Sequence, residues 1–260
     1  MATHQKRMHK HFSKIALSYK HLRTTDLDPV RIISQKLRNL TSTIAADIGC
    51  GDGRYDSLFF KHLNNLYLIC IDNNEKMLKQ ASDYLRGNGI HNFMAMKANA
   101  TDLPLKNGKI DSIFSFNAVH HFDFQRFVKR AAEVTKNGGL IFIYTRLRSQ
   151  NLRNIWGRYF PLFSEKENRL YEFNDIIEIV DSINYVDIES IKSFKFKRKA
   201  NLGQLIEKVK SRHYSTFSLY EEDKLEETLK TFQENIIRKF KDINKIEWVD
   251  ENILLTLNVK

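Results

Sequence analysis

A short apolar run followed by a glycine-rich turn is the feature that most constrains how this chain folds. Residues 44–48 are typical of a buried strand, and Gly49, Gly51 and Gly53 follow in a G-x-G-x-G pattern. Residues 54–63 then have the apolar spacing of a helix. Glycines let a backbone turn sharply and approach a ligand closely. The helix that follows points its unpaired N–H groups at the same place, so this order of elements predicts a nucleotide-type cofactor site.

The spacing of the glycines separates two classes of cofactor. A dinucleotide fingerprint is G-x-G-x-x-G, but here Arg54 stands where its third glycine would be. Asp47 directly precedes the turn, where a carboxylate suits an amino-acid ammonium better than a pyrophosphate. The stretch 44–53 resembles motif I of the class I S-adenosylmethionine-dependent methyltransferases, and the alternative is a tight turn without a ligand. The resemblance implies four cofactor-binding residues here: Asp47, Gly49, Cys50 and Gly51.

The alternation of apolar runs with helical periodicity over about 100 residues predicts a parallel sheet with helices on both faces. The predicted strands of this part are 44–48, 66–72, 92–97, 110–116 and 140–145, and the predicted helices are 54–63, 75–86 and 124–135. The pattern changes afterwards. Residues 149–181 read as helical with a break at Phe160 and Pro161, 201–240 as two helices, and 185–197 and 246–259 as strands.

The resemblance implies an α/β, Rossmann-like class I methyltransferase fold with seven strands, the last of them antiparallel. We therefore expect a single methyltransferase domain over residues 1–260, with a cofactor-binding core at about 40–145. The segments 1–40, 149–181 and 200–240 would form a helical cap that selects the substrate. Within the first of these, residues 5–22 are amphipathic, and Asp28 is the predicted N-cap of a helix that runs to about Leu40.

Further cofactor residues follow from the second motif and from the N-terminus. Asp72 ends the second predicted strand, where a carboxylate can accept hydrogen bonds from both ribose hydroxyls. The stretch that continues through Asn73 resembles the family's second motif, which implies that Met77 packs near the adenine; the alternative is an ordinary core methionine. Tyr19 and Arg23 stand where related enzymes carry a Tyr and an Arg that fold over the cofactor, and Arg23 would pair with the methionine carboxylate.

Two later stretches resemble other motifs of the same family. Residues 98–105 are similar to a Gly-Asp-Ala-x-x-Leu-Pro-Phe run, with Asn99 replacing the Asp that accepts from the adenine amino group and Ala100 next to it. Asn117 follows the fourth predicted strand and would line the methionine side. A catalytic role is predicted for His120 and His121, since a histidine has a suitable pKa to take a proton from an attacking oxygen or nitrogen. The alternative is that they only shape the pocket.

The acceptor is expected near the end of the fifth predicted strand. Tyr144, Arg146 and Arg148 leave this strand, and Tyr159 follows with further arginines. Guanidinium groups suit a carboxylate or a phosphate, so these four residues are the predicted substrate-binding set. A basic helix on the surface is the other interpretation.

Charge leaves a second class of acceptor open. The net charge is +11; residues 1–23 carry six Lys and Arg and no acid, and residues 191–214 carry eight against Glu207 alone. Such patches can bind RNA or be solvated helix faces. The run 47–55 also resembles enzymes that esterify carboxymethyluridine in transfer RNA. The favoured function is methyl transfer from S-adenosylmethionine, leaving S-adenosylhomocysteine, to a small acidic metabolite; the alternatives are an RNA methyltransferase and a non-catalytic binding module.

Composition bounds the cell compartment and excludes some cofactors. At 42% hydrophobic and 28% charged residues, the chain is globular, and no apolar run approaches the ~20 residues that span a bilayer. The basic N-terminus lacks the apolar stretch of a signal peptide. Cys50 and Cys70 fall in predicted core elements and are expected to be reduced, and no Cys/His cluster has zinc spacing. We expect a cytoplasmic protein without a metal.

Overall fold

The computed structural model describes residues 2–17 and 19–260, and this part of the chain divides into two compact units. Unit 1 comprises Met1–Arg23, Arg146–Glu172 and Ser193–Asn252, and unit 2 comprises Thr24–Thr145, Phe173–Lys192 and Ile253–Lys260. The predicted cap segments correspond mostly to unit 1. Residues 24–40 and 173–181, however, belong to unit 2. That the cap covers the cofactor within one domain stays a prediction.

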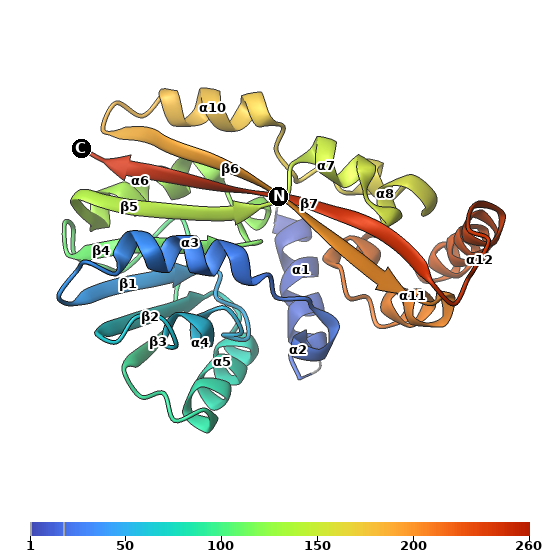
Figure 1. The fold of residues 1–260 in the computed structure, drawn as a ribbon, viewed down its shortest axis with the longest axis horizontal. Coiled ribbons are helices and arrows are strands. Elements are labelled where there is room, and N and C mark those ends of the chain that lie inside the picture. Colours follow the sequence, from blue (N-terminus) through green and yellow to red (C-terminus); the bar gives the residue numbers. More distant parts are fainter. Residues whose placement is uncertain (1, 18) are drawn as a thin grey trace. The chain divides into compact units, whose positions relative to one another are not determined.

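The described residues form one seven-stranded sheet with the order β3-β2-β1-β4-β5-β7-β6 (Figure 1). The pairs β1–β2, β1–β4, β2–β3 and β4–β5 are parallel, and β7 is antiparallel to β5. The predicted Rossmann-like sheet with an antiparallel last strand is therefore confirmed. The strands are β1 (Thr43–Ile48), β2 (Leu66–Asp72), β3 (Phe93–Lys97), β4 (Ile110–Phe116), β5 (Thr135–Thr145), β6 (Val186–Ala200) and β7 (Ile246–Val259).

The central strands are apolar runs because both of their faces are covered, as is usual in parallel sheets. Nearly every residue of β1, β2 and β4 is buried. In the edge strand β6, by contrast, exposed and half-buried side chains alternate along most of its length. Because β1, β2 and β4 are parallel neighbours, their carboxyl ends lie along one edge of the sheet, where ligands bind in open α/β sheets.

The helices of unit 2 begin close to their predicted positions. They are α3 (Leu27–Leu37), α4 (Asp56–Phe59), α5 (Glu75–Gly87), the 3₁₀ helix η1 (Val119–His121), α6 (Phe124–Val134) and α10 (Phe173–Asp181). Helix α5 packs on β2 and β3, and α6 packs on β5 and α10. Asn74 caps α5 as expected, since its side chain accepts hydrogen bonds from the amides of Lys76 and Met77.

Three local predictions in unit 2 need correction. The N-cap of α3 is Asp26 and not Asp28. Helix α4 is much shorter than residues 54–63, because after Phe59 the chain continues in tight turns such as His62 N to Phe59 O at 3.0 Å. Strand β5 begins at Thr135, directly after α6, and not at residue 140, because the residues between them belong to an irregularity in its pairing with β4.

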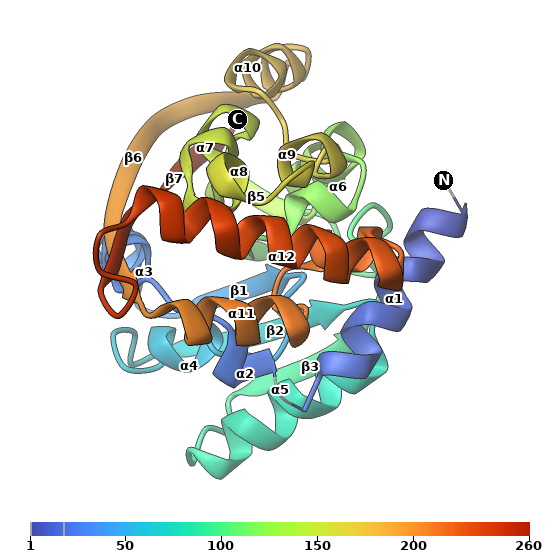
Figure 2. The same ribbon diagram turned by 90° about the vertical axis from the view of Figure 1, so that its right-hand side faces the viewer.

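Unit 1 is mostly helical (Figure 2). Many of the side chains in its core are aromatic. Its helices are α1 (Ala2–Ile15), α2 (Tyr19–Leu22), α7 (Arg148–Arg153), α8 (Ile155–Tyr159), α9 (Phe163–Lys166), α11 (Leu202–Lys210), the 3₁₀ helix η2 (Ser215–Leu219) and α12 (Glu222–Lys239). Trp156 stacks on Phe232 at 5.2 Å and meets Phe217 edge-on at 5.3 Å. None of the helices in the described part of the chain is long and apolar enough to cross a membrane.

Candidate active site

The glycine turn lies between β1 and α4 and has a backbone that only glycine adopts easily. Gly49, Gly51 and Gly53 have φ angles of +77°, +61° and +75°. The amides of Gly49 and Cys50 donate to the carbonyl of Ile71 at 2.8 and 3.0 Å, which ties the turn to the end of β2. A Cβ on Gly49 would stand 2.5 Å from that of Ala118, which follows β4. The turn is therefore packed between the end of β2 and the segment that follows β4, the two strands on either side of β1.

Asp72 stands at the carboxyl end of β2, as predicted, and its carboxylate holds the turn. Its Oδ2 accepts from the amide of Gly51 at 3.1 Å, and its Oδ1 accepts from the amide of Asn74 at 2.8 Å. Each carboxylate oxygen has a second lone pair, and the side chain is only half-buried. Asp72 can thus keep its backbone contacts and still accept hydrogen bonds from two hydroxyls of a ligand.

Asp47 is buried at the end of β1, with 1% of its surface exposed, and no described group donates a hydrogen bond to either carboxyl oxygen. Burial, and then the neighbouring carboxyls of Asp56 and Asp72, raise the pKa of Asp47 well above its ordinary value. Asp56 is also fully buried and accepts a hydrogen bond from the Cys70 thiol at 3.2 Å. A cationic ligand group near Asp47 would favour its ionised form.

The buried carboxyl of Asp56 makes a prediction about stability. Burial raises its pKa from 3.8 to about 6. The contribution of this carboxyl to the free energy of unfolding is therefore fully present below pH 3.8 and is lost as the pH rises through 6. At pH 8 we expect Asp56→Asn to be more stable than the unaltered chain, by roughly 2–3 kcal/mol since one pKa unit is about 1.4 kcal/mol. Urea unfolding followed by circular dichroism between pH 4.5 and 8 measures this.

The matched control for this prediction is Asp83→Asn, because Asp83 lies on α5 with an exposed Lys79 partner at 2.6 Å. Its stability should follow that of the unaltered chain at every pH. An Asp56→Asn profile parallel to that of the unaltered chain between pH 4.5 and 8 would contradict the role given to Asp56.

Asn117, which was predicted to line the methionine side, and His120 and His121, which were predicted to act in catalysis, follow the end of β4. Asn117 has a φ of +52°, rare for a residue with a side chain, and its amide donates to the carbonyl of Tyr144 at 2.7 Å. The rings of His120 and His121 lie 4.0 Å apart at an angle of 44°, and both residues are half-buried. The predicted pair of histidines thus lies just past the carboxyl end of a central strand, beside the glycine turn that Ala118 contacts.

The other predicted cofactor residues of unit 2 lie on neighbouring elements. Met77 is buried on α5 with 2% of its surface exposed, whereas Asn73 is exposed in the turn before this helix. Asn99 is exposed, and its backbone carbonyl accepts from the amide of Asp102 at 3.0 Å, while Ala100 beside it is half-buried. That these side chains contact a cofactor stays a prediction.

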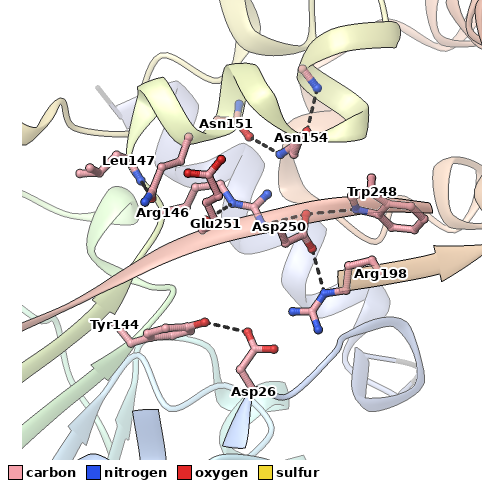
Figure 3. Close-up of polar contacts among 12 residues, drawn as sticks. Asp26, Tyr144, Arg146, Leu147, Asn151, Asn154, Arg198, Trp248, Asp250 and Glu251 are labelled. Atoms are coloured by element: carbon pink, nitrogen blue, oxygen red, sulfur yellow. Dashed lines mark hydrogen bonds and ion pairs between the residues drawn. The ribbon is translucent and has the colours of Figure 1, made fainter. Parts of the chain in front are cut away.

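A buried acid that the sequence patterns did not single out joins β5 to the start of α3. The Tyr144 hydroxyl donates to Asp26 Oδ2 at 2.7 Å (Figure 3), and the Asp26 amide donates to the Tyr55 hydroxyl at 3.3 Å. Tyr55 stacks on Phe116 of β4 at 4.2 Å. The sequence favours Asp28 over Asp26, because Pro29 follows Asp28 and proline is preferred at the first position of a helix. Because its hydroxyl already serves Asp26, Tyr144 anchors the N-terminal segment of unit 2.

The remaining predicted residues belong to unit 1. Arg23 lies over the ring of Tyr19 at 5.2 Å. Arg146 forms an ion pair with Asp250 at 3.3 Å. The Arg148 guanidinium donates to the carbonyls of Leu170 and Asn168, both at 3.0 Å, and so holds a loop of its own unit. The ring of Tyr159 packs on Phe240 at 5.7 Å.

Comparisons with known proteins agree with this arrangement. Residues 46–143 match the methyltransferase domain family. The chain is 28% identical over 160 residues to mouse tRNA (carboxymethyluridine(34)-5-O)-methyltransferase ALKBH8, covering 60% of this chain but only 22% of that protein. The structure of YcgJ from Bacillus subtilis superposes with a TM-score of 0.67 at 15% identity, covering 90% of this chain and 99% of the other. Geranyl diphosphate C-methyltransferase from Streptomyces coelicolor gives 0.55 at 13% identity, covering 88% and 78%.

Residues 46–143 therefore resemble a methyltransferase domain, and the fold is the Rossmann-like fold of solved methyltransferase structures. The residues present fit S-adenosylmethionine, the cofactor that this resemblance implies. The carboxyl oxygens of Asp47 are buried and accept no hydrogen bond from a described group, as suits a cationic ligand. Asp72 has lone pairs left for hydroxyl donors of a ligand, and the backbone of Gly49 and Gly51 lets a ligand approach closely.

Proposed function

We propose that this chain catalyses methyl transfer from S-adenosylmethionine to a small acceptor that carries an acidic group. The observation that supports the cofactor most directly is the hydrogen bond between Gly51 N and Asp72, which joins the turn after β1 to the acid after β2. When bound, S-adenosylmethionine supplies a methyl group on a positively charged sulfur and leaves as neutral S-adenosylhomocysteine. Asp47, Gly49, Gly51 and Asp72 are the residues proposed to hold it.

The chain's part in the reaction is to align the acceptor, exclude water and remove one proton. The residues around the end of β4 would hold the attacking atom of the acceptor against the methyl group that the bound cofactor would supply. If the attacking atom carries hydrogen, a ring nitrogen of His120 or His121 accepts it. These two histidines are favoured because they follow the carboxyl end of β4.

Two measurements test the proposal. Calorimetry with S-adenosylhomocysteine should give a dissociation constant in the micromolar range, about −8 kcal/mol; a folded chain that does not bind would refute it. Incubation with radiolabelled S-adenosylmethionine and, separately, a metabolite extract and total RNA then identifies the acceptor class. Label should appear in acidic small molecules.

RNA is the second candidate acceptor, and two observations favour it. The similarity to a tRNA methyltransferase extends over 160 residues. Moreover, unit 1 contains 25 Lys and Arg against 14 Asp and Glu and so has the whole net charge of +11, whereas unit 2 has 17 of each. Lys195, Lys197 and Lys199 are exposed on β6, while Arg198 between them is half-buried and paired with Asp250 at 3.1 Å.

The three lysines of β6 provide a prediction that separates the acceptors. For a small acceptor, replacing Lys195, Lys197 and Lys199 with Gln should leave turnover unchanged, and filter binding should show only weak binding of total transfer RNA. For an RNA acceptor, the same change should weaken binding and flatten its salt dependence, by roughly 0.7–0.9 for each phosphate that the protein no longer neutralises.

The control for this prediction neutralises three other exposed lysines of unit 1, Lys230, Lys239 and Lys241. It corrects for the loss of net charge alone. Tight, salt-dependent RNA binding that disappears in the β6 variant and persists in the control would replace the small acceptor with RNA.

A further inference from the structure

Arg23 is a cation of unit 1 whose charge the described residues leave without a carboxylate partner. Its Cζ lies 4.7 Å from the centre of the Tyr214 ring and 5.2 Å from that of Tyr19. Its Nε is buried and donates to no described group. A guanidinium held between two aromatic rings keeps a fixed orientation, and a buried N–H without an acceptor is costly. Both features suit a site where an oxygen atom of a ligand accepts a hydrogen bond from Arg23.

Arg146 reaches the same aromatic ring. Its Cζ lies 5.9 Å from the centre of the Tyr214 ring. Arg146 shares its carboxylate partner, because Asp250 also pairs with Arg198 and accepts from the indole N–H of Trp248 at 3.2 Å (Figure 3). One carboxylate therefore serves two guanidinium groups, and the adjacent acid Glu251 pairs with Arg153 at 2.8 Å.

The pKa values of His213 and Lys208 are both lowered in this part of unit 1. His213 is buried, and its ring lies 4.1 Å from that of Tyr214. Burial, followed by the charges of Arg23 and Lys208, lowers the pKa of His213 well below its ordinary value, although its hydrogen bond to the Lys208 carbonyl opposes this. Lys208, over the Trp248 ring at 5.9 Å, also has a lowered pKa, mainly through burial. A bound anion would offset such concentrated positive charge.

Along the chain, Arg23 and Arg146 both lie close to residues that belong to β5 or are hydrogen-bonded to it. Arg146 directly follows Thr145, the last residue of β5. Arg23 directly precedes Thr24, and Asp26 three residues after it is hydrogen-bonded to Tyr144 near the end of β5. Each residue adds at most about 3.8 Å between Cα atoms. Arg146 is therefore joined directly to the last residue of β5, and Arg23 lies three residues before an acid that is hydrogen-bonded to a residue of that strand.

We infer that Arg23 and Arg146, together with the ring of Tyr214, bind the carboxylate or phosphate of the methyl acceptor. The inference rests on the proposed function, since it assigns the acidic group of that acceptor. Arg146 was predicted to bind substrate from its position after β5, whereas Tyr214 was not selected in the sequence. Arg23 was predicted to bind the methionine carboxylate, so the experiment must separate the acceptor from the cofactor.

The test uses the full chain with inorganic phosphate and acetate as separate probes, by calorimetry at low ionic strength. At least one of the two should bind saturably. Arg23→Gln should weaken that binding about tenfold or more, the loss expected for a hydrogen bond to a charged group, and Arg146→Gln should do the same. The matched control is Arg153→Gln, an exposed arginine of the same unit with a carboxylate partner; it should bind the probe as the unaltered chain does.

Affinity for S-adenosylhomocysteine, measured on the same variants, separates the two possible ligands. We expect it to stay within about twofold of the unaltered value, since a shift of 0.4 kcal/mol is about twofold. A loss of S-adenosylhomocysteine binding in Arg23→Gln that matches its loss of anion binding would assign the site to the cofactor carboxylate and overturn the inference. So would no saturable binding of either probe, or equal losses in all three variants. If the unaltered chain binds the anion but no S-adenosylhomocysteine, the proposed function fails and the anion site stands.

Arg146→Gln leaves Asp250 with one partner fewer and can destabilise unit 1. Arg23→Gln breaks no described ion pair, so it remains informative if the other variant does not fold. Circular dichroism of each variant establishes which chains are compared.

Discussion

Gly51→Val is expected to abolish S-adenosylhomocysteine binding in a chain that still forms its sheet. Gly51 has a φ of +61°, and its amide is the donor to Asp72 at 3.1 Å. A β-branched side chain at such a φ costs about 1–2 kcal/mol of backbone strain, moves the amide and occupies the space that a ligand needs. Calorimetry should show a loss of more than about 100-fold, or ~2.7 kcal/mol.

The control for this loss is Gly108→Val. Gly108 has nearly the same φ, +63°, but a Cβ there would meet nothing within 4 Å, and it lies in the loop before β4, at the amino end of that strand. Both variants should lose similar stability in urea, and only Gly51→Val should lose the ligand. Unchanged affinity in a folded Gly51→Val chain would show that the turn is only structural.

Asp72→Ala has the second largest expected effect on cofactor binding. The carboxylate is proposed to accept from two ribose hydroxyls, and such charge-assisted hydrogen bonds contribute roughly 1.5–3 kcal/mol. The dissociation constant for S-adenosylhomocysteine should rise about 10- to 150-fold by calorimetry. The variant also frees the amides of Gly51 and Asn74, so part of the loss comes from a less ordered turn.

Two further variants separate these contributions. Asp72→Asn keeps one acceptor oxygen for the backbone amides but loses the charge and half of the acceptor capacity, so its affinity should fall between that of Asp72→Ala and that of the unaltered chain. Asp83→Ala, at an exposed acid on α5, should bind normally. Equal affinity for Asp72→Ala and the unaltered chain would remove Asp72 from the site.

The recognition of the sheet and of its cofactor motif from the sequence depended on local patterns. The bounds of β2, β4 and β7 are those expected, because each is an apolar or alternating run bounded by turn residues. Gly49 and Gly51 could be placed in a tight turn because their conformation is a property of the residue type. Asp72 could be placed at the end of its strand because it directly follows six apolar residues.

The errors occurred where a distant contact outweighs a local preference. Pro29 makes Asp28 the favoured cap in the sequence, but Asp26 is the N-cap in the structure, where it accepts from the Tyr144 hydroxyl, 118 residues away. The two glycines after α6 suggest a helix end, but a Cβ on Gly139 would lie 2.9 Å from the Asp111 carbonyl, so at least this glycine serves close packing next to β4. Such preferences depend on which strand lies alongside.

The sequence by itself determined the fold class, the positions of most strands along the chain and the glycine turn after the first of them, because apolar periodicity and glycine conformation are local properties of the chain. Only the tertiary structure decided which charged side chains are already used inside the fold. Arg148 is engaged by backbone carbonyls, Arg146 shares Asp250 with Arg198, and Arg23 stacks on Tyr214 without a described carboxylate partner. These arginines look alike in the sequence, because the availability of a charge depends on partners that folding brings from far along the chain.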